Sequence, residues 1–203
     1  MPETGPPPPL VLASASAVRA RLLRAAGVPF QVEPVSVDEA QIKSALGAQG
    51  ASAADTAQAL ADLKAQRGSQ RDDAALVIGA DQILECGDWF DKPKTLDDAR
   101  RHLETLSGRV HRLFSAVAVA RAGTIIWRHG ERADLTMRKL SPPFVDAYLE
   151  TIGESALQTV GAYEIEGPGA QLFETIEGDY FNVLGLPLLP LLEFLRTHKA
   201  IAS

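Results

Sequence analysis

Seven small and apolar residues, AALVIGA at 74–80, run directly into an aspartate, Asp81. The length and composition of this stretch predict a buried strand that ends at the aspartate. A charge at the end of an apolar run is costly unless something pairs with it. A partner for the carboxylate of Asp81 is therefore expected, and a Lys-Pro pair follows shortly after, at Lys92.

Strands and helices alternate along the first half of the chain. Ser16 is expected to cap the first helix and Gly27 to end it, and Ser52 or Asp55 is expected to cap the next. The predicted elements are a strand at 10–14, a helix at 16–27, a strand at 30–35, a polar loop at 36–40, a helix at 51–67, the strand at 74–80 and a helix at 95–108.

The second half predicts long strands within 111–140 around a turn at Ala122 and Gly123, and a helix from Ser141 to Gly153. A hairpin or strand-turn at 170–185 and a closing helix at 186–200 follow. The fold class is therefore α/β, with a mixed rather than a purely parallel sheet. We expect one domain at 10–203 after a disordered, proline-rich lead-in at 1–9.

The bulk composition excludes several kinds of partner. A net charge of −6 argues against non-specific nucleic-acid binding and against an anionic membrane surface. No apolar run is long enough to span a membrane, and the start of the chain lacks a signal-peptide pattern. The single cysteine, Cys86, excludes an internal disulfide, and a cytoplasmic location fits best. The four histidines show no ligand spacing and are expected at the surface or at caps.

The segment LASASAVRARLL predicts an anion site. A strand leads through a small-residue turn into a helix start, whose free N–H groups favour an anion. Ser14 and Ser16 can donate hydroxyl hydrogen bonds, and Arg19 can bind phosphate oxygens with two N–H groups. The alternative is a plain strand–turn–helix with a serine cap.

Asp81 is the sharpest single candidate. Open α/β sheets place ligands at the carboxyl ends of strands, where a carboxylate can bind Mg²⁺ and take a proton from water. Its alternative role is a turn residue at the strand end. Asp38 and Glu39 read alone as solvated loop residues, and Lys64 and Lys92 as surface lysines, although Lys92 could hold a phosphate.

A glycine-rich segment, GAYEIEGPG at 161–169, surrounds Glu166, and Asn182 and Gly185 precede the last helix. Its glycines imply tight backbone turns. The segment is either part of a binding site or a simple connection between strands.

Eight motifs occur in order: LVLASASAVRARLL, VDE, LADLKA, VIGADQIL, DKP, LETLSGRVH, GAYEIEG and IEGDYFNVLGLPL. Together they resemble the Maf family of nucleoside triphosphate pyrophosphatases over nearly the whole chain. The resemblance implies a twisted mixed sheet, like that of inosine triphosphatases, with a nucleotide in a cleft between two lobes. The reaction would yield a nucleoside monophosphate and pyrophosphate.

The resemblance also implies roles for individual residues. Asp81 would be the general base and Glu39 its acidic partner, and both would hold a divalent cation, Mg²⁺ or Mn²⁺. Ser14 and Arg19 would bind phosphate, together with Lys64 and Lys92. A homodimer is expected from the resemblance, although the sequence shows no interface.

Three positions bear on the base. The branch similar to 7-methyl-GTP enzymes carries Trp, Gln and Glu where this chain has Val18, Gln82 and Glu166. Two matches favour a guanine-type or modified nucleotide, because a carboxylate accepts both donors of the guanine edge. Val18 departs from that branch, since it offers no aromatic face for a cationic base. Ala17 and the segment GESALQTVGAY at 153–163 also depart from the family pattern.

Two rival functions stay open. The protein could bind nucleotides and regulate septum formation without essential catalysis. It could also be a metal-dependent phosphomonoesterase, which would release orthophosphate instead of pyrophosphate.

Overall fold

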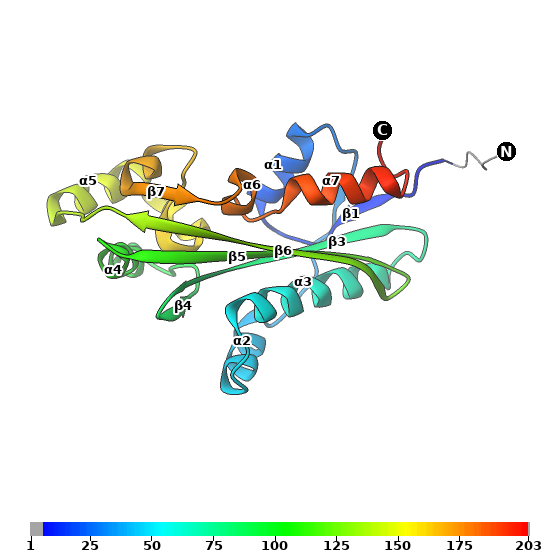
Figure 1. Cartoon of the computed structure of the whole chain (residues 1–203), viewed down its shortest axis with the longest axis horizontal. Coiled ribbons are helices and arrows are strands. Elements are labelled where there is room, and N and C mark those ends of the chain that lie inside the picture. Colours follow the sequence, from blue (N-terminus) through cyan, green and yellow to red (C-terminus); the bar gives the residue numbers. More distant parts are fainter. Residues whose placement is uncertain (1–5, 203) are drawn as a thin grey trace. The chain divides into compact units, whose positions relative to one another are not determined.

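The computed structural model describes residues 6–202, and Figure 1 shows the arrangement of its elements. Residues 1–5 of the predicted lead-in lie outside the described residues, and residues 6–9 have no regular secondary structure. The strands are β1 (Leu10–Leu12), β2 (Gln31–Val32), β3 (Leu76–Cys86), β4 (Asp88–Phe90), β5 (Val110–Arg121), β6 (Thr124–Met137) and β7 (Phe173–Glu177). The α-helices are α1 (Ala17–Ala25), α2 (Glu39–Ala48), α3 (Ala53–Ser69), α4 (Leu96–Leu106), α5 (Pro142–Ile152), α6 (Tyr180–Val183) and α7 (Leu188–Thr197). Three short 3₁₀ helices lie at Gly153–Gln158, Val160–Ala162 and Pro168–Leu172.

The strands form a mixed sheet in the order β2-β1-β3-β5-β6-β7, with β4 paired to β3. β1 is parallel to both β2 and β3, whereas β4 is antiparallel to β3 and β7 to β6. The α/β class and the mixed sheet are therefore confirmed. The chain divides into two compact units, 1–82 with 115–131 and 180–203, and 83–114 with 132–179. The single domain and the cleft between lobes stay predictions.

Two predicted element boundaries are wrong. β3 does not end before Asp81 but continues to Cys86, because the apolar pattern resumes at Ile83 and Leu84, which are fully buried. The predicted loop at 36–40 contains the start of α2. Asp38 caps that helix, accepting a hydrogen bond from the backbone N–H of Gln41 at 3.0 Å, so Glu39 is a helical residue.

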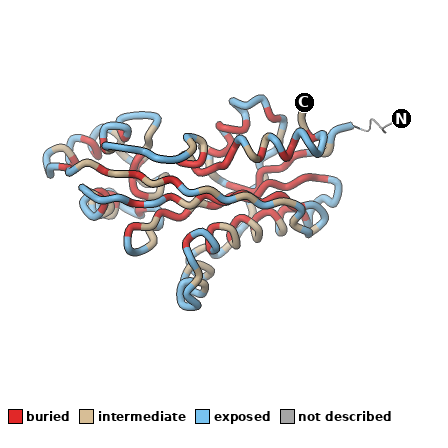
Figure 2. The backbone as a smooth tube through the Cα atoms, in the orientation of Figure 1, coloured by how far each residue is buried: buried red, intermediate tan, exposed pale blue. Residues whose placement is uncertain are grey.

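The first unit is layered around β1 and β3. Leu76, Ile78 and Ala80 join a core cluster with residues of α1 and α7, whereas the intervening Val77 packs with Val11. Alternate residues of a strand point to opposite faces, so both faces of β3 are covered here. Figure 1 shows α3 on one side of β3 and α1 and α7 on the other, and Figure 2 shows the buried strand residues between them.

Helix α3 approaches β3 unusually closely. Its buried residues include Ala57, Ala61, Ala65 and Gly68, all small. A Cβ on Gly79 would lie 2.5 Å from the backbone nitrogen of Ala65 and closer still to a carbonyl oxygen of the helix. Only glycine permits this approach, and it brings α3 side chains against the following residues of β3.

The second unit contains α4, α5 and β7. Helix α4 begins with a capping box, in which Thr95 and Asp98 are bonded reciprocally. The prediction that the histidines are surface or capping residues is wrong for His111, which is 1% exposed and lies 2.9 Å from the hydroxyl of Tyr163. Burial lowers the pKa of His111 to about 4. Cys86 is buried, as a structural thiol should be.

Within the described residues, no helix has both the length and the apolar character that crossing a bilayer requires.

Gly79→Ala tests the close contact of α3 with β3. The added methyl must displace the helix backbone, so the free energy of unfolding should fall by about 1–3 kcal/mol. Urea unfolding measures this loss. The matched control is Gly130→Ala in β6, where the nearest atom would lie 3.7 Å from the new methyl. Equal stabilities for the two variants would contradict the contact.

Candidate functional site

The candidate site forms where β1 ends beside β3. The last pair of the two strands is Leu12 with Ile78, after which the N–H of Ala13 still bonds the carbonyl of Ile78 at 2.8 Å. β1 then turns into α1, while β3 continues through Asp81. The site therefore lies at the carboxyl end of β1, within β3, and not at the end of β3 as the sequence predicts.

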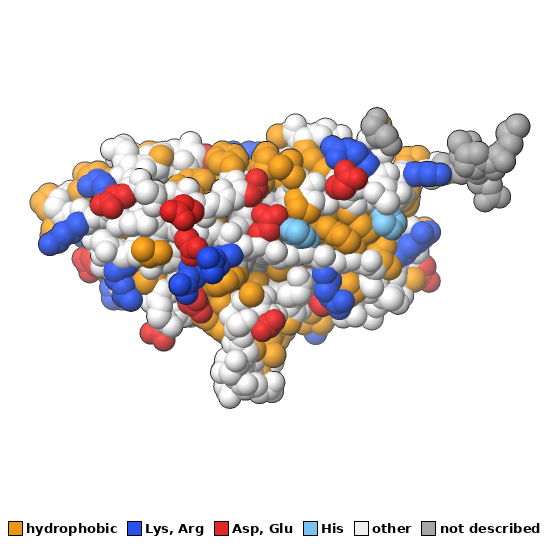
Figure 3. All heavy atoms as spheres, in the orientation of Figure 1, with side chains coloured by type: hydrophobic (Ala, Val, Ile, Leu, Met, Phe, Trp, Pro, Cys, Tyr) orange, Lys and Arg blue, Asp and Glu red, His pale blue; other side chains and the backbone are white. Residues whose placement is uncertain are grey.

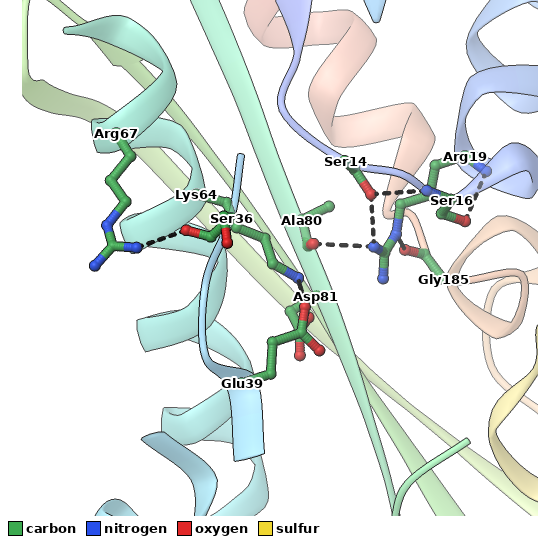
Figure 4. A network of polar contacts seen from close by, with 10 residues as sticks. All are labelled: Ser14, Ser16, Arg19, Ser36, Glu39, Lys64, Arg67, Ala80, Asp81 and Gly185. Carbon is green, nitrogen blue, oxygen red and sulfur yellow. Dashed lines mark hydrogen bonds and ion pairs between the residues drawn. The ribbon is translucent and has the colours of Figure 1, made fainter. Parts of the chain in front are cut away.

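Beyond the end of β1, the side chain of Arg19 bonds to the backbone of β3. Its Nη1 donates to the carbonyl of Ala80 at 3.0 Å and to Ser14 Oγ at 3.1 Å, and its Nε donates to the carbonyl of Gly185 at 2.7 Å (Figure 4). Arg19 is 9% exposed and makes no ion pair with any residue among 6–202. Burial lowers the pKa of this guanidinium, and the negative charges of Asp81 and Glu39 offset part of that effect. A buried cation held by neutral oxygens favours an anion as ligand.

The start of α1 adds donors beside this guanidinium. Ser16 caps the helix, accepting from the N–H of Arg19 at 3.4 Å, and its own N–H donates to Ser14 Oγ at 3.3 Å. Ser14 is buried. The predicted cap at Ser16 is therefore confirmed, and Ser14 accepts a hydrogen bond from Arg19, whereas the binding of phosphate by these two residues stays a prediction.

A second charged cluster surrounds Lys64. Its ammonium lies 2.6 Å from Asp81 Oδ1 and 2.6 Å from Glu39 Oε1. Lys64 and Asp81 are 6% and 4% exposed, so Lys64 is not the surface lysine that its helix alone suggests. Burial raises the pKa of Glu39, but the charge and hydrogen bond of Lys64 more than offset this and hold that pKa below its usual value.

Strand register explains this cluster. Asp81 follows Val77 and Gly79 at alternate positions, so it points to the face that α3 covers. Glu39 reaches the same ammonium because Asp38 starts α2 directly before it. Figure 4 shows the Lys64 cluster on one side of β3 and the Arg19 cluster on the other.

Asp81 retains an unused oxygen. Its Oδ2 is buried and has no hydrogen-bond partner among the described residues. An unsatisfied carboxylate oxygen indicates that a donor or cation belongs there. No three carboxylate, thiol or imidazole groups of residues 6–202 converge as metal ligands, so a cation at Asp81 would need oxygens from a ligand.

Gln82 points to the opposite face from Asp81. Its Nε2 donates to Ser115 Oγ at 2.9 Å and to the carbonyls of Asn182 and Val183, both at 3.2 Å. Val18 is partly buried against the core of this unit, an ordinary packing role. Sequence reasoning missed Ser115, and the only signal was one serine within the apolar run LFSAVAVA.

Lys92 and Glu166 belong to the second unit. Both are exposed, Lys92 between β4 and α4 and Glu166 between two 3₁₀ helices. Their approach to the Asp81 cluster stays a prediction. The glycine-rich segment is tightly folded, as expected, since a Cβ on Gly169 would collide with the backbone of Glu164.

Figure 3 shows no single-sign field over the face that it presents: blue and red side chains lie interspersed. The Arg19 and Lys64 clusters instead concentrate charge inside the first unit. An α/β chain with a buried, unpaired guanidinium at a strand-to-helix turn has the features of an anion-binding protein.

The family follows from comparison with known proteins. A family model described as Maf-like protein matches residues 9–198. The chain belongs to the Maf family.

Curated relatives are similar over nearly their full lengths. A "Nucleoside triphosphate pyrophosphatase" of Granulibacter bethesdensis is 50% identical over 95% of this chain and 98% of its own. A "7-methyl-GTP pyrophosphatase" of Rhizobium meliloti is 48% identical over 96% and 98%. A solved structure of a "Nucleoside-triphosphatase / dITP/XTP pyrophosphatase" from Mycobacterium abscessus aligns with a TM-score of 0.41 and 15% identity over 94% of this chain and 93% of its own.

Lys64→Met tests whether Lys64 neutralises buried charge. Removing the ammonium leaves Asp81 without its ion-pair partner, so the free energy of unfolding should fall by about 3 kcal/mol. Adding Asp81→Asn should recover part of that loss, as a double-mutant cycle in urea measures. Arg128→Met removes the exposed ion pair with Asp62 and should cost less than about 1 kcal/mol. Additive effects of the Lys64 and Asp81 changes would show that the pair is not coupled.

Proposed function

We propose that this protein is a nucleoside triphosphate pyrophosphatase, which cleaves the bond between the α- and β-phosphates with water. The observation that carries the proposal is the pairing of two clusters across β3. One holds a buried guanidinium that donates to neutral oxygens, Arg19, and the other a carboxylate with an unused oxygen, Asp81. The activity named for the relatives at 50% and 48% identity supports it.

The turn before α1 is the proposed phosphate-binding segment. Arg19 is already fixed by three oxygens, so little side-chain entropy is lost when a phosphate arrives. Ser14 and the N-terminus of α1 add hydrogen-bond donors. A triphosphate carries about four negative charges, so Lys64 and the predicted Lys92 would be needed to offset the rest.

Asp81 is the proposed general base. Its Oδ1 is held by Lys64 at 2.6 Å, which orients the carboxylate, and its Oδ2 is left to accept a proton from water. Glu39 pairs with the same ammonium, also at 2.6 Å. The ammonium of Lys64 lies 2.6 Å from both carboxylates and offsets their negative charge. No covalent intermediate is required, because positioning and charge stabilisation supply the rate.

We also propose a divalent cation, Mg²⁺ or Mn²⁺, at Asp81 and Glu39. Mg²⁺ sites are commonly built from one or two carboxylates with substrate phosphate oxygens, and the unused Oδ2 of Asp81 fits that pattern. Such an ion supplies polarisation of the phosphate oxygens and of a bound water.

A guanine-type or modified base, such as that of 7-methyl-GTP, is the proposed preference. Relatives at 48–49% identity named as 7-methyl-GTP pyrophosphatases support it, as do Gln82 and Glu166. Val18 weighs against a base that must stack on an aromatic ring, and its packing in the core supports a structural role. Dimerisation and a cytoplasmic location stay predictions.

Pyrophosphate release tests the activity directly. Wild-type protein with Mg²⁺ or Mn²⁺ should release pyrophosphate from one or a few of a panel of nucleoside triphosphates that includes 7-methyl-GTP. Asp81→Asn should lower turnover by at least roughly a hundredfold, because the shape is kept and the base is lost. The matched control is Asp62→Asn, an acidic residue of α3 outside the cluster, which should keep near wild-type turnover.

The same assay separates the rivals. Orthophosphate as the only inorganic product would indicate a phosphomonoesterase. Binding without turnover in folded protein would favour the regulatory role.

A further inference from the structure

Gln82 is held in one orientation by three oxygens. Its Nε2 lies 2.9 Å from Ser115 Oγ and 3.2 Å from the carbonyl oxygens of Asn182 and Val183. Backbone carbonyls can only accept hydrogen bonds, so the NH₂ end of the amide must face them. A flipped amide would place its oxygen against all three, which excludes that orientation.

Ser115 completes this constraint. Its hydroxyl donates to the carbonyl of Asn182 at 2.9 Å, so its single proton is used and its lone pairs are left for Gln82. Ser115 is 1% exposed and lies in β5 among apolar residues. Water therefore does not compete for this hydroxyl, and the chain of hydrogen bonds from Gln82 through Ser115 to Asn182 has one direction.

The consequence appears at the other end of the amide. Gln82 Oε1 accepts no hydrogen bond from any residue among 6–202. A Cβ on Gly185 would lie 3.5 Å from this oxygen and 3.6 Å from Nη2 of Arg19, so both atoms border the same space beside Gly185. An acceptor oxygen repels phosphate oxygens and attracts an N–H or O–H group.

We propose that Ser115 is a positioning residue for substrate selection: it locks Gln82 so that only the amide oxygen faces the ligand. Gln82 thereby selects a hydrogen-bond donor on the nucleoside part of the substrate. An N–H of the base and an O–H of the sugar share this chemistry. The identity of the ligand rests on the proposed function. The fixed orientation of the Gln82 amide does not depend on that function.

Steady-state kinetics test the selection. Ser115→Ala removes the shortest of the three hydrogen bonds that hold the amide and leaves the two longer ones to the carbonyls of Asn182 and Val183. The amide is then held less firmly, so kcat/KM for the best substrate should fall roughly three- to tenfold, the effect of one hydrogen bond, chiefly through KM. Ser115→Thr keeps the hydroxyl and should restore most of the loss. The control is Ser69→Ala, which removes another buried serine hydroxyl of the first unit, bonded to Gln66 and Gly123, and should leave selectivity unchanged.

Substrate ratios identify the donor. If the base supplies it, Ser115→Ala lowers the preference between guanosine and adenosine triphosphates. If the sugar supplies it, the preference between ribose and 2′-deoxyribose forms falls instead. Unchanged ratios in both comparisons would overturn the selective role of Ser115.

A ligand-free measurement keeps the inference independent of activity. In wild-type protein the side-chain amide protons of Gln82 should exchange with solvent at least roughly tenfold more slowly than those of the exposed Gln49, as NMR resolves. Ser115→Ala should speed the exchange. Equal rates for Gln82 and Gln49 in the wild type would overturn the locked amide, whereas slow exchange without any pyrophosphate release would refute the proposed function alone.

Discussion

The close contact between α3 and β3 is the constraint on which the charged cluster depends. Glycine at position 79 lets the helix backbone meet the strand, and only then does Lys64 reach Asp81 at 2.6 Å. A buried carboxylate of this kind is costly unless a cation lies beside it. The small residues of α3 therefore do more than fill the core, because they set the distance between two opposite charges.

Because successive side chains of a strand point to opposite faces, the neighbouring residues Asp81 and Gln82 belong to different sides of β3. Asp81 points to the face covered by α3, and Gln82 points to the opposite face, towards Ser115. The early end of β1 leaves the carbonyl of Ala80 to Arg19, which binds there from the second face. A shift of one residue in the register of β3 would exchange the two faces and destroy both clusters.

Features that depend on neighbouring residues in the sequence, such as helix caps and tight turns, were predicted correctly. The caps at Ser16 and Ser52 are confirmed, as is the turn at Ala122 and Gly123. The predicted end of β3 and the predicted loop at the start of α2 were wrong. In both places a charged residue suggests the end of a regular element, because its partner is distant in the sequence. Lys64 lies 17 residues before Asp81, and nothing local distinguishes it from a surface lysine.

The site itself was predictable only in part. The motifs named Ser14, Arg19, Glu39, Lys64 and Asp81, and the structure groups them into two clusters of one unit. Ser115 was missed because its contribution comes from a neighbouring strand, and one polar residue in an apolar run gives no pattern. The roles of Lys92 and Glu166 depend on the second unit and stay predictions.

Isotope labelling in ¹⁸O-water tests the proposed reaction most directly. Attack of water on the α-phosphorus should place the label in the nucleoside monophosphate and leave the released pyrophosphate unlabelled, as mass spectrometry would detect. Label in the pyrophosphate would mean attack at the β-phosphorus, and would contradict Asp81 as the base that activates water at the α-phosphate.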